Sequence, residues 1–368
     1  MLPYFLLIFV SGLFPLVVYQ SPNAVSRLEN SERTRKKNKL TLRIFFIGLF
    51  LLLALRDITV GKDLKEYKNI FEMCQNQSFR DLHRLDWELG YTSFNKLIGF
   101  ISQEYRIFLV ITALITLIPI YKLYVQEEKY SFLLIVLFIN MPCFLMMFSG
   151  LRQTMAISIG IVAYVLLTQK KYIFSVLFVV LAANFHISAF VLLLIYPAYF
   201  LKIKTKHLLY IVPVMLVIYL FRIPILTFLI GFMPSQYIYF YGEVQETGAI
   251  GMMILFLIFF VFAFVILDEK AMSKQDYFMR NVLLIATIFQ FFVPIHGLIQ
   301  RASYYFLIFV PVSIVRIVQA PKRYLKSITL VAVIVMVYFF TLYFFYTAYF
   351  STDNLLDVFP YKFFWSGQ

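Results

Sequence analysis

Five ionisable side chains lie at the ends or turns of long apolar segments. A charge in apolar surroundings costs free energy, and residues that carry one there are usually functional. The five are three arginines and two histidines, Arg56, Arg152, His186, His296 and Arg301. An arginine fork donates to two oxygens at once and keeps its charge, which suits a phosphate or pyrophosphate. A neutral imidazole can accept the proton of a sugar hydroxyl. These residue types together predict a binding site for an anionic lipid head group with a base beside it.

Each of these residues also has a less specific interpretation. An arginine at a helix end can be an interfacial anchor, and a histidine inside a bundle can hydrogen-bond a neighbouring helix. Anchoring is a weaker explanation for all three arginines than for one. Each of them has Gly, Gln, His or Asp nearby rather than only Leu and Phe. His186 interrupts an otherwise apolar run, whereas His296 lies between Pro294 and Gly297, which are typical of a structural turn.

Further polar residues near these five could bind the sugars of a substrate. The carboxylates of Asp63 and Glu88 could bind hydroxyl groups, Glu88 or His296 could replace His186 as the base, and Tyr91 could stack on a sugar face. The candidate binding residues are Arg56, Asp63, Glu88, Tyr91, Asn95, Gln153, His296 and Gln300. The two cysteines have no metal-site spacing, and the sequence holds no Walker, GxGxxG, HExxH or GxSxG motif.

The composition requires that membrane helices position these residues. Of 368 residues 62% are hydrophobic and only 14% are charged, with a mean hydropathy of +0.83. A soluble domain is closer to half apolar and a quarter charged, so this chain would leave large apolar patches in water. We therefore predict an all-α polytopic membrane protein.

The apolar segments predict about twelve spans of about 20 residues each, with both termini outside. Three stretches carry basic residues at both ends and are expected to be hairpins that start and end in the cytoplasm. They cover 131–169, 172–201 and 281–315 and turn near 149–153, 184–186 and 296–301. Each arm of the second hairpin measures only about 21 Å at 1.5 Å per residue. Its tip should therefore stop short of the outer surface, in a cavity lined by short or broken helices.

The remaining segments complete a single transmembrane domain, 1–368. Two outer loops are expected, 56–105, with a short amphipathic helix, and 223–249. The basic segment 27–43 is expected to be a cytoplasmic loop. The other expected spans are 2–20, 41–55, 106–124, 207–222, 250–267 and 327–347.

The net charge of +14 follows this topology. Loops assigned to the cytoplasm hold 21 Lys and Arg residues against seven acids, and the outer side holds 12 of each kind. The entire excess is therefore positive-inside bias. A basic surface for nucleic acid is not predicted.

Four short motifs and a late arginine resemble those of the EpsG-like polymerases of bacterial surface polysaccharides, which are relatives of the Wzy O-antigen polymerases. In chain order they are Arg56…Val60-Gly61-Lys62-Asp63…Tyr67, Glu88-Leu89-Gly90-Tyr91…Asn95, Gly150-Leu151-Arg152-Gln153…Ala156, Ala183-Asn184-Phe185-His186-Ile187-Ser188, and Arg301 before Tyr304-Tyr305-Phe306. The resemblance extends from about residue 40 to residue 310. It departs at Lys62, where the family often has a small or hydroxyl residue.

The resemblance implies a multispan glycosyltransferase of GT-C-like architecture in the bacterial inner membrane, with its active site facing the periplasm. It implies polymerisation of undecaprenyl-pyrophosphate-linked oligosaccharide repeat units into O-antigen or a related surface polysaccharide. Donor and acceptor would both be lipid-linked, membrane lipid would surround the protein, and a chain-length regulator remains open as a further partner. No nucleotide sugar is needed, because the lipid pyrophosphate is the leaving group.

In the mechanism that we expect, Arg152 and Arg301, with Arg56, hold the donor pyrophosphate, and His186 accepts the proton of the acceptor hydroxyl. Three fixed cations could replace a metal, so no metal and no other cofactor is expected. An O-antigen ligase could use the same arginine and histidine chemistry. A flippase for lipid-linked oligosaccharide, or a channel or scaffold, are further alternatives, although the polar residues gather on the predicted outer side only.

Overall fold

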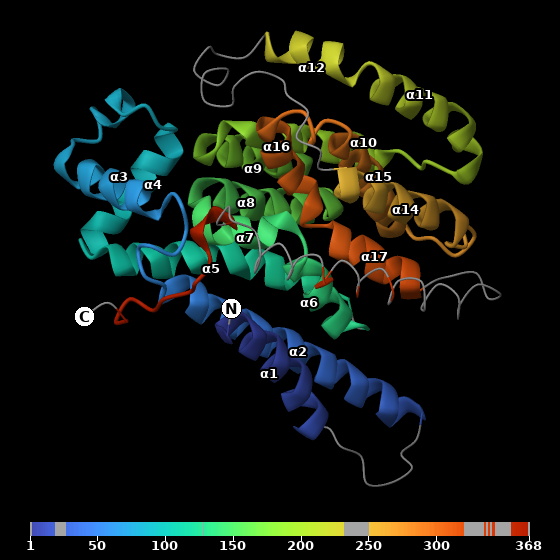
Figure 1. The fold of residues 1–368 in the computed structure, drawn as a ribbon, viewed down its shortest axis with the longest axis horizontal. Coiled ribbons are helices and arrows are strands. Elements are labelled where there is room, and N and C mark those ends of the chain that lie inside the picture. Colours follow the sequence, from blue (N-terminus) through green and yellow to red (C-terminus); the bar gives the residue numbers. More distant parts are fainter. Residues whose placement is uncertain are drawn as a thin grey trace. The chain divides into compact units, whose positions relative to one another are not determined.

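A computed structural model describes residues 2–18, 27–127, 129–231, 250–319, 335, 338, 341–342 and 355–366. These residues form helices and turns without a strand, apart from one isolated bridge, which confirms the all-α prediction. The chain divides into two compact units: unit 1 is Met1–Phe190 with Val335–Gln368, and unit 2 is Val191–Ile334 (Figure 1). That the whole chain makes one transmembrane domain stays a prediction.

Unit 1 holds the longest apolar helices. The helices α2, α5, α8 and α9 pack against one another in that order, and α1 lies along α2. Most of them have no polar face, as expected for helices in a core or a membrane. Their bounds are α1 Leu2–Val18, α2 Arg27–Ala54, α3 Leu64–Asn76, α4 Leu89–Ile101, α5 Tyr105–Tyr124, α6 Ser131–Ile139, α7 Pro142–Ser149, α8 Leu151–Thr168 and α9 Tyr172–Phe185.

Unit 2 is arranged around α15, which packs against α10, α14, α16 and α17. Arg316 and Arg280 form ion pairs there with Asp276 at 2.9 Å and Glu269 at 3.0 Å. The 3-10 helix Ile187–Leu194 leads into this unit. Its helices are α10 Ile195–Phe200, α11 Leu208–Leu220, α12 Arg222–Ile230, α14 Ile250–Val265, α15 Lys274–Gln290, α16 Gly297–Leu307 and α17 Val310–Gln319.

Among the described residues, α5 and α8 are each long and apolar enough to cross a bilayer. Up to five spans result if each of three bent helix pairs counts as one, and α1, α9 and α14 add shorter apolar helices. The prediction of about twelve spans in a GT-C-like arrangement therefore stays a prediction. Most of the expected last span, 327–347, and most of the outer loop 223–249 lie outside the described residues, whereas α12 already occupies the start of that loop.

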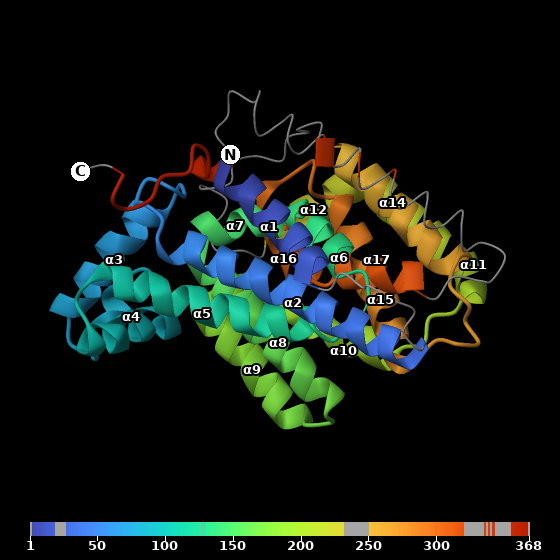
Figure 2. The same ribbon diagram turned by 90° about the horizontal axis from the view of Figure 1, so that it is seen from below.

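The expected helix breaks are present. α7 ends at Ser149 and α8 begins at Leu151, α9 ends at Phe185, and α16 begins directly after His296. α8 and α9 form a close antiparallel pair joined by a short turn at Lys170 (Figure 2). The start of α8 and the end of α9 consequently lie at the same end of the pair.

Two local features differ from the predictions. A 64° bend separates α6 from α7, because Pro142 cannot continue α6 and instead opens α7 at its first turn. The basic segment 27–43 is not a loop: α2 runs through it without a break. Lys, Arg and Glu are good helix formers, and Glu32 pairs with Lys36 one turn later at 2.9 Å.

The segment 355–366 packs on the loop that follows α2. Arg56 bridges to Phe363, and the Gly61 amide donates to the Asp357 carbonyl at 3.0 Å. Tyr4 of α1 donates to the Val358 carbonyl at 3.1 Å. The beginning of α1, the end of α2 and the segment 355–366 thus lie together in unit 1. That both termini lie on the outer side stays a prediction.

Gly61 fixes this loop against the end of α7. Its φ of +117° is open to glycine, and a Cβ atom there would lie 2.0 Å from the Phe148 carbonyl oxygen. Two residues later, the Asp63 amide donates to the Ser149 hydroxyl at 3.3 Å. The loop therefore reaches the break at which α8 begins.

Candidate functional site

Glu88 joins the start of α8 to the end of α9. It directly precedes α4, and its Oε2 accepts a hydrogen bond from Nη1 of Arg152 in the first turn of α8. Its Oε1 lies 3.2 Å from Nδ1 of His186, directly after α9, and accepts from the Ile187 amide at 3.1 Å. Three of the residues predicted from the sequence, Glu88, Arg152 and His186, are therefore in direct contact in unit 1. We call these three residues the Glu88 cluster.

The Glu88 cluster is mostly shielded from solvent, with side-chain exposed fractions of 15% for Glu88, 19% for Arg152 and 11% for His186. Burial alone would raise the pKa of Glu88, but the hydrogen bond from His186 and the charge of Arg152 lower it to about 2. An ionised carboxylate can only accept hydrogen bonds, so Nδ1 of His186 must carry the proton in this contact. Because a carboxylate of such low pKa is a weak base near neutral pH, Nε2 of His186 is the better proton acceptor.

Three aromatic rings hold the guanidinium of Arg152. Its Cζ lies 3.9 Å from the centre of the Trp87 ring and 5.8 Å from that of Tyr91. Tyr67 interacts with the Arg152 side chain and packs edge-on against both rings, at 6.1 Å from Trp87 and 5.9 Å from Tyr91. Such contacts attract the cation and fix its plane.

Trp87 and Tyr67 were not predicted as site residues. Their positions did give a signal, because Trp87 directly precedes Glu88 and Tyr67 lies one helical turn after Asp63. Asp63 touches the turn that carries Arg152 through its backbone. All four early motifs therefore meet in unit 1 around the Glu88 cluster.

The family model of the EpsG family matches residues 39–363. The chain belongs to the EpsG family. This is a family of Wzy-type polymerase-like membrane proteins, with glycosyltransferase-like polymerase activity. No curated protein and no solved structure matches the chain. The Glu88 cluster and Arg301 lie within the matched range.

Other predicted residues of this EpsG-family chain have different surroundings in unit 1. Arg56 is 1% exposed, lies 5.6 Å from the ring of Phe148, and has Tyr4, Tyr105, Tyr361 and Arg106 as its electrostatic neighbours. Its side chain thus belongs to a second group of residues, separate from the contacts around Glu88. A role for Arg56 in pyrophosphate binding stays a prediction.

Tyr91, Asn95 and Gln153 are buried. The ring of Tyr91 packs against the guanidinium of Arg152. Nδ2 of Asn95 donates to the Tyr91 carbonyl at 2.7 Å inside α4. These positions support the helices that carry Glu88 and Arg152. Stacking of a sugar on Tyr91 would need an exposed ring face, and the half-buried Trp87 offers more of one.

The remaining predicted residues belong to unit 2. His296 caps α16, since its Nδ1 accepts from the Leu298 amide at 3.2 Å, and its side chain is buried. This matches its interpretation as a structural turn. Gln300 is exposed and Arg301 is half-buried on α16. That Arg301 and His296 act together with Arg152 and His186 stays a prediction from the sequence.

Gly90 allows α4 to approach the end of α9. A Cβ atom at this position would lie 2.7 Å from the carbonyl oxygen and 2.8 Å from the Cβ of Asn184. We expect Gly90→Ala to lower the free energy of unfolding by about 1–3 kcal/mol and to move Glu88 away from His186. Gly251→Ala is the control, because a Cβ there meets nothing within 4 Å. Equal unfolding temperatures of the two purified variants would contradict the close approach.

Proposed function

We propose that this EpsG-family protein extends a surface polysaccharide by glycosyl transfer between undecaprenyl-pyrophosphate-linked repeat units on the periplasmic face of the bacterial inner membrane. The observation that carries the proposal is the Glu88 cluster, in which one carboxylate positions both a base and a cation. O-antigen or a related polymer would be the product.

The reaction forms one bond and breaks one. The acceptor hydroxyl oxygen attacks the anomeric carbon of the donor glycan, and the bond from that carbon to the pyrophosphate oxygen breaks. The bonding electron pair leaves with the undecaprenyl pyrophosphate, and the hydroxyl proton moves to Nε2 of His186. The growing glycan thereby passes to the non-reducing end of the incoming unit.

Glu88 acts through its two partners. It keeps the proton on Nδ1 of His186, so that Nε2 presents a lone pair, and it offsets the positive charge that the imidazole acquires. Glu88 is therefore a positioning residue rather than the base.

Arg152 is suited to the leaving group. Nη1 is bound to Glu88, but a guanidinium has five N–H donors, and the Arg152 side chain is still 19% exposed. The fork therefore retains donor capacity for an anionic oxygen. Because Glu88 offsets the charge of Arg152, a pyrophosphate needs further cations. The sequence predicts Arg301 for this purpose, whereas Arg56, which it also predicts, is 1% exposed and would have to become accessible first.

The position of the Glu88 cluster along α8 and α9 supports an outward-facing site. Arg152 and His186 lie at one end of this antiparallel pair, and Lys170 and Lys171 form the turn at the other end. Lysines at a turn favour the cytoplasmic side. The Glu88 cluster is then directed toward the periplasm.

A deletion strain tests the function. Loss of a polymerase should leave lipopolysaccharide with a single repeat unit. Loss of a ligase should leave lipopolysaccharide without any attached repeat unit. Loss of a flippase should leave the lipid-linked units on the cytoplasmic face of the membrane. Complementation with the intact gene should restore the ladder of chain lengths. Either of the other two patterns would contradict the proposal and assign the corresponding alternative.

Glu88→Gln should lower kcat about 10²- to 10⁴-fold, because glutamine can no longer fix the tautomer of His186. The rate is measured with the purified protein and a lipid-linked repeat unit in liposomes. The double variant E88Q/H186Q should be no slower than H186Q alone, since both changes remove the same function. Additive losses would show that Glu88 acts independently of His186. Glu72→Gln, an exposed glutamate of α3 that pairs with Lys68, is the matched control.

A further inference from the structure

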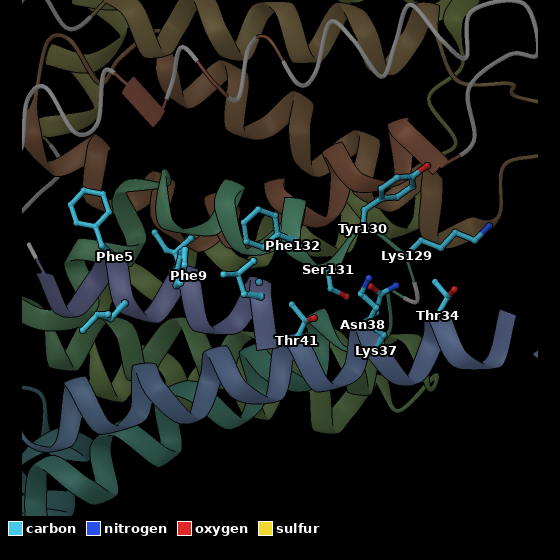
Figure 3. A pocket seen from close by; sticks show the side chains of 14 residues that line it. Phe5, Phe9, Thr34, Lys37, Asn38, Thr41, Lys129, Tyr130, Ser131 and Phe132 are labelled. Carbon is cyan, nitrogen blue, oxygen red and sulfur yellow. The ribbon is translucent and has the colours of Figure 1, made fainter. Parts of the chain in front are cut away.

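A groove of about 970 Å³ opens in unit 1 between α1, α2 and the start of α6 (Figure 3). This volume is at the upper end of the range of about 300–1,000 Å³ for ligand pockets. None of its lining residues belongs to α4, α8 or α9, which carry the Glu88 cluster. The groove is therefore a feature distinct from the candidate active site.

The groove changes from apolar to basic along its length. Phe5 and Phe9 lie at one end, whereas Thr34, Lys37 and Lys129 lie toward the other (Figure 3). Its lining residues include two lysines and no carboxylate. The groove therefore has positive charge at one end and apolar side chains at the other.

The apolar part is exposed as well as concave. Its larger side chains are 43% to 63% exposed, namely Phe5, Leu6, Phe9, Leu13 and Phe132. From Phe5 to Leu13, α1 offers a wall of about 12 Å at 1.5 Å per residue, compared with about 15 Å for half the hydrocarbon thickness. The wall therefore matches most of one leaflet.

We propose that this groove binds an anionic phospholipid, with an acyl chain along the phenylalanines of α1 and the phosphate between Lys37 and Lys129. A lysine can lay its stem on apolar surface while its ammonium stays at the polar end. Basic pockets between helices on the cytoplasmic side select anionic head groups, and Lys37 lies in the segment for which the charge pattern predicts that side. A soluble phosphate would gain nothing from the apolar wall, whereas a bilayer phospholipid supplies both parts.

The test uses the full-length protein in detergent, titrated with phosphatidylglycerol and, separately, with phosphatidylcholine, and bound lipid is counted by native mass spectrometry. The wild type should retain phosphatidylglycerol in preference. K37Q/K129Q should bind it roughly 10- to 30-fold more weakly, since each lysine near an anionic surface contributes about 1 kcal/mol. K37R/K129R should keep the affinity. K170Q/K171Q, which removes two lysines from the α8–α9 turn outside the groove, should not change it.

Folding and location are checked separately. Lys129 is exposed and Lys37 is half-buried, so the variants should unfold at the wild-type temperature. A photoreactive phosphatidylglycerol should label peptides of α1, α2 or α6. Equal binding of both lipids, wild-type affinity in K37Q/K129Q, or labelling confined to other peptides would overturn the proposal.

Discussion

His186→Gln should slow chain extension about 10²- to 10⁴-fold, the usual contribution of a positioned general base. Glutamine can keep a contact with Glu88, but it cannot accept the proton of the acceptor hydroxyl near neutral pH. The initial rate of polymer formation, measured with a lipid-linked repeat unit at saturating concentration, reports the loss. The effect should fall on kcat, because the proton moves only as the new bond forms.

Substitution of a second histidine, His83, serves as the control for the effect of His186→Gln. His83 is exposed in the short 3-10 turn Leu82–Arg84, where its Nδ1 contacts the Arg80 carbonyl at 2.5 Å. The His83→Gln variant should form polymer at the wild-type rate. A rate of H186Q within threefold of the wild type, in a variant that folds normally, would remove His186 from the mechanism.

Arg152→Gln should reduce the rate about 10²- to 10³-fold through loss of charge stabilisation at the leaving pyrophosphate. Arg152→Lys should recover little of it, because an ammonium cannot contact Glu88 and an anionic oxygen with the geometry of a planar fork, and it loses the stack on Trp87. The same polymerisation assay measures both variants.

Arg84 provides the control for Arg152. It lies in the same predicted outer loop and pairs with Asp81 on an exposed surface at 3.2 Å. Arg84→Gln and Arg84→Lys should therefore leave the rate unchanged. If R152K polymerised as fast as the wild type, the fork of Arg152 would not bind the leaving group.

The pH dependence of stability shows whether Arg152→Gln also breaks the ion pair. The pKa of Glu88 is held at about 2, below about 4.3 for an unperturbed glutamate. A lowered pKa stabilises the fold above the unfolded value, and this contribution is lost as the pH falls from about 4.3 toward 2. The difference in unfolding temperature between wild type and R152Q should accordingly shrink over that range. A constant difference would mean that the two side chains do not share a charge interaction.

Local rules in the sequence predicted the helix ends that carry the site. Gly150 separates α7 from α8, and the polar residues Asn184 and His186 mark the end of α9 within an apolar run. The bend at Pro142 could have been predicted by the same rules, because a proline is disfavoured inside a helix and favoured in its first turn. The prediction of a loop at the basic start of α2 was wrong, because charge alone does not distinguish a loop from a helix. Packing against other helices supplies most of a helix's stability.

The sequence by itself determined the membrane class and the motifs of the EpsG family, because hydropathy is a sum over neighbouring residues and motifs are short local patterns. It also predicted on which side of the membrane the charges lie. Only the tertiary structure decided that Glu88 contacts Arg152 and His186, which lie 64 and 98 positions away. It also decided that Arg56 belongs to a separate group of residues. Contacts over such separations depend on which helices pack closely, as α4 does on α9 at Gly90, and no local pattern encodes that choice.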